Sequence, residues 1–227
     1  MLYLNNIPAS DVGVIVEHRP RRPVPRRKSY AWDVPGRGRI LRQLDAWENV
    51  TLQYDLAVVP LPGTSLAATV NLAVGWLSQG GYMRLWDDTD PLVYYLAAFP
   101  GGTDFEDVLH RARRARVSFD ARPERFLLSG EAATVFPANG ALENPTAYPS
   151  RPLITLRGSG SGAIQIAGLS FTASNVNGLV IDCEAQTTTG PSAAIQGSWP
   201  KLDPGGNPIS FSGGVTSLEI VPRWFEI

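Results

Sequence analysis

Short runs in which apolar and polar residues alternate recur along the first two thirds of the chain and predict strands. The clearest run alternates as a half-buried strand does, and another is rich in valine and isoleucine. A Pro-Gly-Arg-Gly turn is expected at residues 35–38. The predicted strands are residues 10–18, 30–34, 49–59, 82–86, 92–99, 117–120 and 125–130.

Two segments have helical spacing instead. The first begins after Thr64 or Ser65, either of which can cap a helix, and ends at the glycine pair 80–81. The second begins at Thr103, where Glu106 completes a capping box, and runs to about residue 116. Their apolar stripes are Leu66, Val70, Ala73, Val74 and Leu77 in the first, and Phe105, Val108, Leu109, Ala112 and Ala115 in the second.

After a proline-rich segment at 142–152, every element has the pattern of a short strand. Three prolines in that segment exclude a helix interior, and charged residues become sparse beyond it, so it is predicted to be a linker. Glycine-rich turns are expected at 158–162 and 174–178. The strands expected are 153–157, 163–167, 169–173, 179–183, 208–211 and 215–222, which together predict a small antiparallel sandwich.

Composition narrows the class of protein. The chain has 227 residues, 44% of them hydrophobic, with a formal net charge of -1, so wholesale disorder is not expected. It has no apolar run of transmembrane length, and its first residues lack the basic start and apolar core of a signal peptide. Its one cysteine, Cys183, cannot form an intrachain disulfide and is expected to be a small core residue.

A basic, proline-rich arm at residues 19–28 is the sharpest local feature. Three prolines keep it extended, and its positive charges repel one another. The arm could contact nucleic acid, dock on an acidic face of another protein or of another copy of this chain, or be a solvated loop. Nucleic-acid binding is disfavoured because no recognition helix or aromatic-rich strand accompanies the arm. The candidate protein-contact residues are Arg19, Arg21, Arg22, Arg26, Arg27 and Lys28.

No constellation of residues predicts catalysis, a metal or a cofactor. His18, His110 and Cys183 are scattered, with no pair at metal-ligand spacing. Asp87, Asp88 and Asp90 lack the ligand pattern of a calcium loop and favour a polar hairpin turn. Residues 158–162 lack the Lys-Ser/Thr of a phosphate loop. The carboxylates that could form a glycosidase pair, with nothing in the sequence to select two of them, are Glu17, Glu48, Glu124 and Glu131.

Several stretches resemble, in order and across nearly the whole chain, the distal tail (Dit) proteins of long non-contractile-tailed bacteriophages. Each stretch is short, and the specificity comes from their order. They are residues 34–38 (Val-Pro-Gly-Arg-Gly) followed by 45–50 (Asp-Ala-Trp-Glu-Asn-Val), 76–88, 119–130 with Arg-Pro-Glu-Arg-Phe at 122–126, 144–154, and 211–224. The basic arm is not among them, so its role stays open; our hypothesis is an intersubunit or tube-facing loop.

The resemblance implies a mainly β fold with two domains. Residues 1–141 would be a β-rich, ring-forming domain with one or two helices, and residues 142–227 a galectin-like antiparallel β-sandwich. Six copies would form a ring in the virion, at the tail tip or baseplate, after synthesis in the host bacterial cytoplasm.

The resemblance also implies a structural, non-enzymatic role with no cofactor and no membrane contact. The homo-hexamer would join the tail tube protein to the tail-tip hub, a tail-associated lysin or tail fibre protein. It would surround the channel used by the tape measure protein and then by DNA, which passes without sequence-specific binding. Some family members also carry receptor-binding proteins.

A carbohydrate-binding module or receptor-binding protein is the alternative, because a galectin-like sandwich could present a sugar platform. Trp199, in Gly-Ser-Trp-Pro at 197–200, is the best candidate for that platform, although a core or interface tryptophan is favoured. A hydrolase is a more distant alternative.

Overall fold

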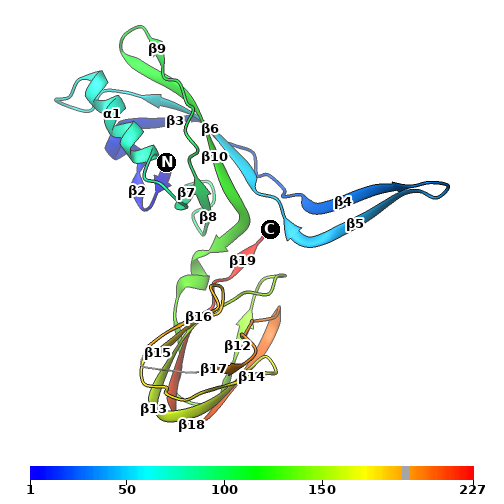
Figure 1. The fold of residues 1–227 in the computed structure, drawn as a ribbon. Coiled ribbons are helices and arrows are strands. Elements are labelled where there is room, and N and C mark those ends of the chain that lie inside the picture. The colour runs from blue at the N-terminus through cyan, green and yellow to red at the C-terminus, as the bar shows by residue number, and fades with distance from the viewer. Residues whose placement is uncertain (191–194) are drawn as a thin grey trace. The chain divides into compact units, whose positions relative to one another are not determined.

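The structure, a computed structural model, describes residues 1–190 and 195–227 and contains two compact units (Figure 1). Unit 1 comprises Met1–Arg125 together with Ile227, and unit 2 comprises Phe126–Glu226. Each unit has its own cluster of buried hydrophobic side chains. In the part of the chain that the structure describes, no helix is both long and apolar enough to span a membrane.

The division between the units falls before the expected boundary at 141/142. The proline-rich segment expected to be a linker is instead part of unit 2, because β12 (Gly140–Asn144) pairs with β18 (Gly205–Val221). The buried amide of Asn144 donates hydrogen bonds to the carbonyls of Tyr148 (3.0 Å) and Leu202 (3.1 Å). Buried Ser150 donates to the carbonyl of Pro222 at 2.7 Å. These bonds satisfy the polar groups of a proline-rich turn and fix it to the sheet.

Unit 1 is built on an antiparallel sheet whose main path runs β2-β1-β7-β8-β10-β6-β3, with β9 paired to β10. Alternation on β6 places Leu52 and Tyr54 in the core, opposite Phe119 and Val117 of β10. The predicted strand at 49–59 is therefore confirmed. The strands are β1 (Leu2–Leu4), β2 (Ile7–Pro8), β3 (Val14–His18), β6 (Val50–Val58), β7 (Met83–Asp87), β8 (Val93–Ala98), β9 (Glu106–Val108) and β10 (Ala112–Leu127).

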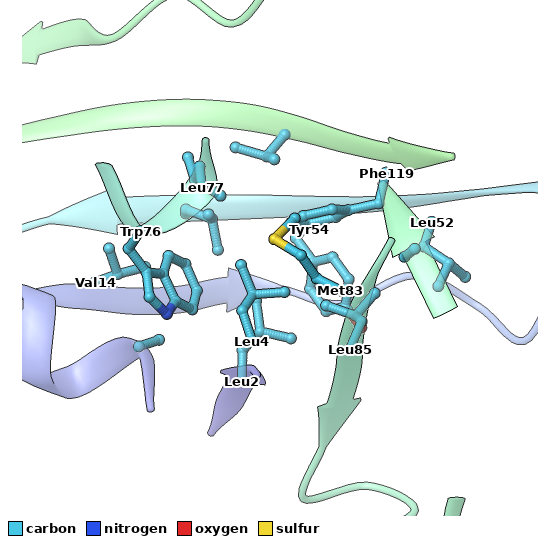
Figure 2. Close-up of a cluster of buried hydrophobic side chains, with 14 of the residues drawn as sticks. Leu2, Leu4, Val14, Leu52, Tyr54, Trp76, Leu77, Met83, Leu85 and Phe119 are labelled. Atoms are coloured by element: carbon cyan, nitrogen blue, oxygen red, sulfur yellow. The ribbon is translucent and has the colours of Figure 1, made fainter. Parts of the chain in front are cut away.

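The first predicted helix is confirmed as α1 (Leu66–Leu77). The Ser65 hydroxyl accepts a hydrogen bond from the backbone N–H of Ala68 at 3.2 Å, which caps the first turn. Figure 2 shows Trp76 and Leu77 of this helix among the side chains of the sheet, near Leu4. A short 3-10 helix, η1 (Ala9–Val12), ends at Gly13, whose φ is +71° and where a Cβ would lie 2.4 Å from Cγ2 of Thr69.

The second predicted helix is wrong. Residues 106–108 form β9, Leu109 and His110 turn the chain with positive φ angles of 51° and 56°, and β10 begins at Ala112. The local capping pattern is overridden because β10 pairs with β6 from Arg113 to Ala121 and thereby buries Val117 and Phe119. Leu109, expected on the buried stripe, is 84% exposed.

Strands β4 (Arg27–Val34) and β5 (Gly38–Trp47) form a separate two-stranded ribbon (Figure 1). The turn expected at 35–38 joins them, and Val34 pairs with Gly38 across it. All of β4 except Val34 is exposed to solvent. The ribbon therefore lacks the covering layer that the main sheet of unit 1 has.

Unit 2 is built on an antiparallel sheet that curls around its own core. The main strand order is β11-β18-β13-β14-β17. In addition, β12 pairs with β18, β15 pairs with β13, and β16 pairs with β15. This confirms the β-rich character expected of the C-terminal part. A second 3-10 helix, η2 (Leu128–Glu131), precedes the strands. The remaining strands of this sheet are β11 (Thr134–Phe136), β13 (Leu153–Ile166), β14 (Leu169–Ala173), β15 (Leu179–Asp182), β16 (Thr187–Thr189) and β17 (Ile195–Gly197). The last strand, β19 (Phe225–Glu226), pairs with β10 and is not part of this sheet.

Residues 158–162, expected to be a hairpin tip, lie instead inside β13. The register with β18 shifts on either side of Gly158, as at a β-bulge. A Cβ on Gly158 would lie 1.9 Å from the carbonyl oxygen of Gly214, and one on Gly214 would lie 1.7 Å from that of Ser159. The glycines thus permit two long strands to approach closely where they bend, rather than ending a strand.

Candidate assembly surface

The basic arm begins on the Asp-rich turn between β7 and β8. Arg19 makes an ion pair with Asp88 at 2.5 Å and donates to the hydroxyl of Thr89 at 2.9 Å. Asp88 also contacts the N-terminal amino group. That contact, together with Arg19, lowers the pKa of the Asp88 carboxyl. An acidic surface that attracts the arm is therefore present within unit 1 itself.

The other five predicted arm residues do not form one cluster. Arg21 and Arg22 line a cavity in unit 1. The backbone carbonyl of Arg26 accepts a hydrogen bond from the N–H of Glu48 at 2.8 Å. Arg27 and Lys28 belong to β4, and the guanidinium of Arg27 lies 4.7 Å from the centre of the Trp47 ring. The arm thus links the acidic turn to the ribbon and presents its cations along the way.

The ribbon presents an apolar surface that no pattern in the sequence predicted. Tyr30 is 65% exposed, Trp32 47%, Ile40 42% and Leu41 59%. Trp32 lies directly opposite Ile40 in the antiparallel register, and Tyr30 follows on the same face two residues away. The alternation of apolar and polar residues in 30–34 and 38–43 indicates strands. It does not indicate whether a second layer covers them. We call Tyr30, Trp32 and Ile40 the ribbon face.

The aspartates predicted to form a turn do so, and each has partners inside the protein. Asp87 accepts hydrogen bonds from the hydroxyl of Tyr54 at 3.0 Å and from the N–H of Thr89 at 2.9 Å. Asp90 pairs with Arg125. Burial, followed by Asp87, raises the pKa of the Tyr54 hydroxyl, so Tyr54 stays a neutral donor. Across residues 1–190 and 195–227, no group of three or more His, Cys, Asp or Glu side chains is placed to hold a metal ion.

The remaining candidate side chains have ordinary structural surroundings. His110 is exposed in the β9–β10 turn, where its backbone N–H donates to Asp107 at 2.7 Å, and His18 ends β3. Glu17 pairs with Arg114 at 2.9 Å, and Glu124 pairs with Arg122 at 3.2 Å.

In unit 2, Cys183 is buried in the core, and burial raises the pKa of its thiol to about 12. Trp199 is half-buried and packs against the same core. Neither side chain has the surroundings of a reactive thiol or a fully exposed aromatic platform. Next to Cys183 in the chain, Asp182 accepts two hydrogen bonds from Arg223, at 2.8 and 3.0 Å, and Arg223 lowers the pKa of that carboxyl to about 2.

This succession of a β-rich unit with one α-helix and an exposed ribbon, followed by a curled antiparallel unit, is the fold of a phage Dit protein. The likeness is to the SPP1 Dit protein (gp 19.1), a paradigm of the hub adsorption apparatus in phages that infect Gram-positive bacteria. It covers 100% of this chain and 98% of that chain, with a TM-score of 0.75 and 13% sequence identity. The resemblance seen in the sequence is thereby confirmed as one of fold.

Two weaker likenesses are to chains of the phage P2 baseplate in its activated conformation. One structure, with calcium, gives a TM-score of 0.47 at 9% identity, and the other, with strontium, gives 0.49 at 10%. Each covers 92% of this chain and 90% of the other. No protein-family model and no curated protein sequence matches the chain.

Proposed function

We propose that this protein is a non-enzymatic structural component of a phage tail tip, a hexameric ring adaptor that joins the tail tube to the tail-tip hub. The observation that carries the proposal is the full-length likeness to the SPP1 Dit protein, which extends over both units. Fold alone does not assign function, so surfaces suited to assembly must support it.

The ribbon face supports an assembled state. An isolated two-stranded ribbon is marginally stable in water, and exposed contiguous apolar surface commonly marks a protein interface. Tyr30, Trp32 and Ile40 lie together on one face of such a ribbon. We propose that this face, together with the arm residues Arg26, Arg27 and Lys28, contacts the neighbouring subunit of the ring. A closed ring gives every copy the same cover, as cyclic symmetry requires.

The partners follow from the same proposal. The ring contacts the tail tube protein on one side and the hub protein on the other, and its channel admits the tape measure protein and DNA. Unit 2 is available to receptor-binding proteins. The ring is part of the virion and is made in the bacterial cytoplasm.

Native mass spectrometry combined with negative-stain imaging tests the ring. We expect a particle of six copies with a central hole at tens of micromolar protein. If the protein alone is monomeric, the measurement is repeated with the tail tube and hub proteins. A chain that stays monomeric with both partners contradicts the proposal and returns weight to the carbohydrate-binding alternative, which a glycan array with the Trp199→Ala variant would then test.

A further inference from the structure

Unit 1 contains a cavity of about 390 Å³ between the arm and the β7–β8 turn. Its floor is apolar, formed by the buried side chains of Leu52, Tyr54 and Leu85. Half-buried Tyr95, opposite Leu85 in the pairing of β7 with β8, adds aromatic surface. The volume falls within the range of roughly 300–1,000 Å³ typical of ligand pockets, and the mixture of apolar floor and few polar groups is also typical.

The charge around the cavity is positive. Four arginines line it, Arg19, Arg21, Arg22 and Arg125, against two aspartates, Asp87 and Asp90. Both aspartates already serve the protein: Asp87 accepts from Tyr54 at 3.0 Å, and Asp90 pairs with Arg125, which is only 5% exposed. Arg19 is likewise held by Asp88, but the lining as a whole carries more guanidinium groups than carboxylates, and this net positive charge favours an entering carboxylate.

The arm holds two of these arginines beside the cavity. Arg19 fixes the beginning of the arm through Asp88 and Thr89, and Pro20 and Pro23 line the cavity themselves. Each proline restricts its own φ angle, which reduces the number of conformations available to the segment between them. Arg21 and Arg22 lie in that segment, so part of the ordering cost of binding is met before a ligand arrives.

We propose that this cavity binds an acidic peptide segment of a neighbouring tail protein. One aromatic or branched aliphatic side chain packs on the apolar floor beside the ring of Tyr95, and the carboxylates beside it pair with Arg21 and Arg22. A bulky anchor in a pocket with charged groups at its rim is the usual anatomy of an energetic hot spot. The binding chemistry stands on the cavity alone; only the choice of a tail protein as the source of the peptide rests on the proposed function.

Capped tripeptides test the chemistry with the whole chain in calorimetry and in ¹⁵N–¹H NMR. The probe is acetyl-Glu-Trp-Glu-amide; acetyl-Gln-Trp-Gln-amide lacks the charges, and acetyl-Glu-Ala-Glu-amide lacks the anchor. We expect the first to bind at least tenfold more tightly than either of the others, with shifts centred on the residues that line the cavity. Equal affinities for all three, or shifts centred elsewhere, would overturn the proposal.

Variants locate the site. Arg21→Gln combined with Arg22→Gln is expected to weaken the first peptide at least tenfold. The matched control, Arg111→Gln with Arg151→Gln, removes the same charge from exposed positions outside the cavity and should change affinity less than twofold. Val93→Phe, which fills the cavity, should abolish binding without removing charge. Equal losses in the two arginine pairs, or unchanged binding in Val93→Phe, would contradict the assignment.

Two further measurements distinguish peptide binding from nucleic-acid binding and from the proposed function. A single-stranded oligothymidine that binds more tightly than the acidic peptide, and that loses affinity in Arg21→Gln/Arg22→Gln, would overturn it in favour of nucleic acid. Ring formation is measured in the same samples. If the peptide binds but no ring forms under any condition, the peptide site is supported and the proposed function is contradicted. If a ring forms but does not bind the peptide, the proposed function is supported and the peptide site is contradicted.

Discussion

Two antiparallel ladders of unit 1 are built in the same way and differ in what covers them. In the β6–β10 ladder, Leu52 and Tyr54 face Phe119 and Val117 and are buried under α1 and neighbouring strands. In the β4–β5 ladder, Trp32 and Ile40 face each other in equivalent positions and stay exposed. Backbone pairing alone therefore does not distinguish a core strand from a surface ribbon, and only the second layer does. The ribbon carries large apolar side chains like those of the core, but no second layer covers them.

The largest expected effect comes from breaking the buried ladder. Phe119→Ala removes a fully buried ring from β10 and should lower the free energy of unfolding by about 3–5 kcal/mol, since the cavity left behind adds to the lost transfer energy. Urea denaturation followed by circular dichroism measures it. A loss below about 1 kcal/mol would mean that this ladder does not carry the stability of unit 1.

An ionic pair in unit 2 gives an intermediate effect that depends on pH. Because Arg223 holds the pKa of Asp182 at about 2, below its usual value, the pair stabilises the fold above roughly pH 4, and that contribution is lost as the pH falls toward 2. The contribution is of the order of 2 kcal/mol. Asp182→Asn should lower stability at pH 7 and flatten its dependence between pH 4 and pH 2. Parallel acid profiles for the two proteins would refute the assignment.

A smaller loss is expected at the start of α1. Ser65→Ala removes the hydroxyl that caps the helix and should cost about 1 kcal/mol. Ser65→Asn, which retains a capping oxygen, is the control and should cost only a few tenths of that. Thermal unfolding of the three proteins under identical conditions makes the comparison. An equal loss in both variants would show that the cap hydrogen bond is not what the helix requires.

The smallest effect on folding is expected at the ribbon face. This variant tests most directly the difference between the buried β6–β10 ladder and the exposed β4–β5 ladder. Trp32→Ser with Ile40→Ser alters side chains that are 47% and 42% exposed and lie outside the core of unit 1, so the unfolding free energy should change by less than about 0.5 kcal/mol. Under the proposed function, ring formation in native mass spectrometry should be lost. Exposed Tyr82, outside the ribbon, supplies the control substitution Tyr82→Ser, which should leave assembly intact. Rings of normal stability in the double variant would remove the ribbon from the interface.

Local signals in the sequence were sufficient where the structure is local. Ser65 and the spacing after it located α1, and alternation located β6, because each pattern is decided within a few residues. The second predicted helix failed because the pairing of β10 with β6, far away in the sequence, outweighs a good capping box. The glycines at 158–162 looked like a turn because their close approach to Gly214 is invisible until the two strands are side by side.

The candidate site shows the same limit. The arm was found because its charges and prolines are contiguous, whereas the cavity beside it draws residues from five separate stretches between Arg19 and Arg125. The ribbon face was missed because an alternating strand is the same in sequence whether or not another layer covers it. Residues that act together only after folding have no common signal in the chain.

The charges of the ribbon bear on whether the free chain aggregates. Exposed strands with apolar side chains are templates for edge-to-edge aggregation, and charged residues along such strands suppress it. Arg27, Lys28, Arg39 and Arg42 lie on the two strands that carry Trp32 and Ile40. Like charges on two colliding ribbons repel, so we expect these residues to suppress aggregation of free chains. Replacing them with neutral residues would therefore be expected to shift the protein from the soluble fraction to inclusion bodies.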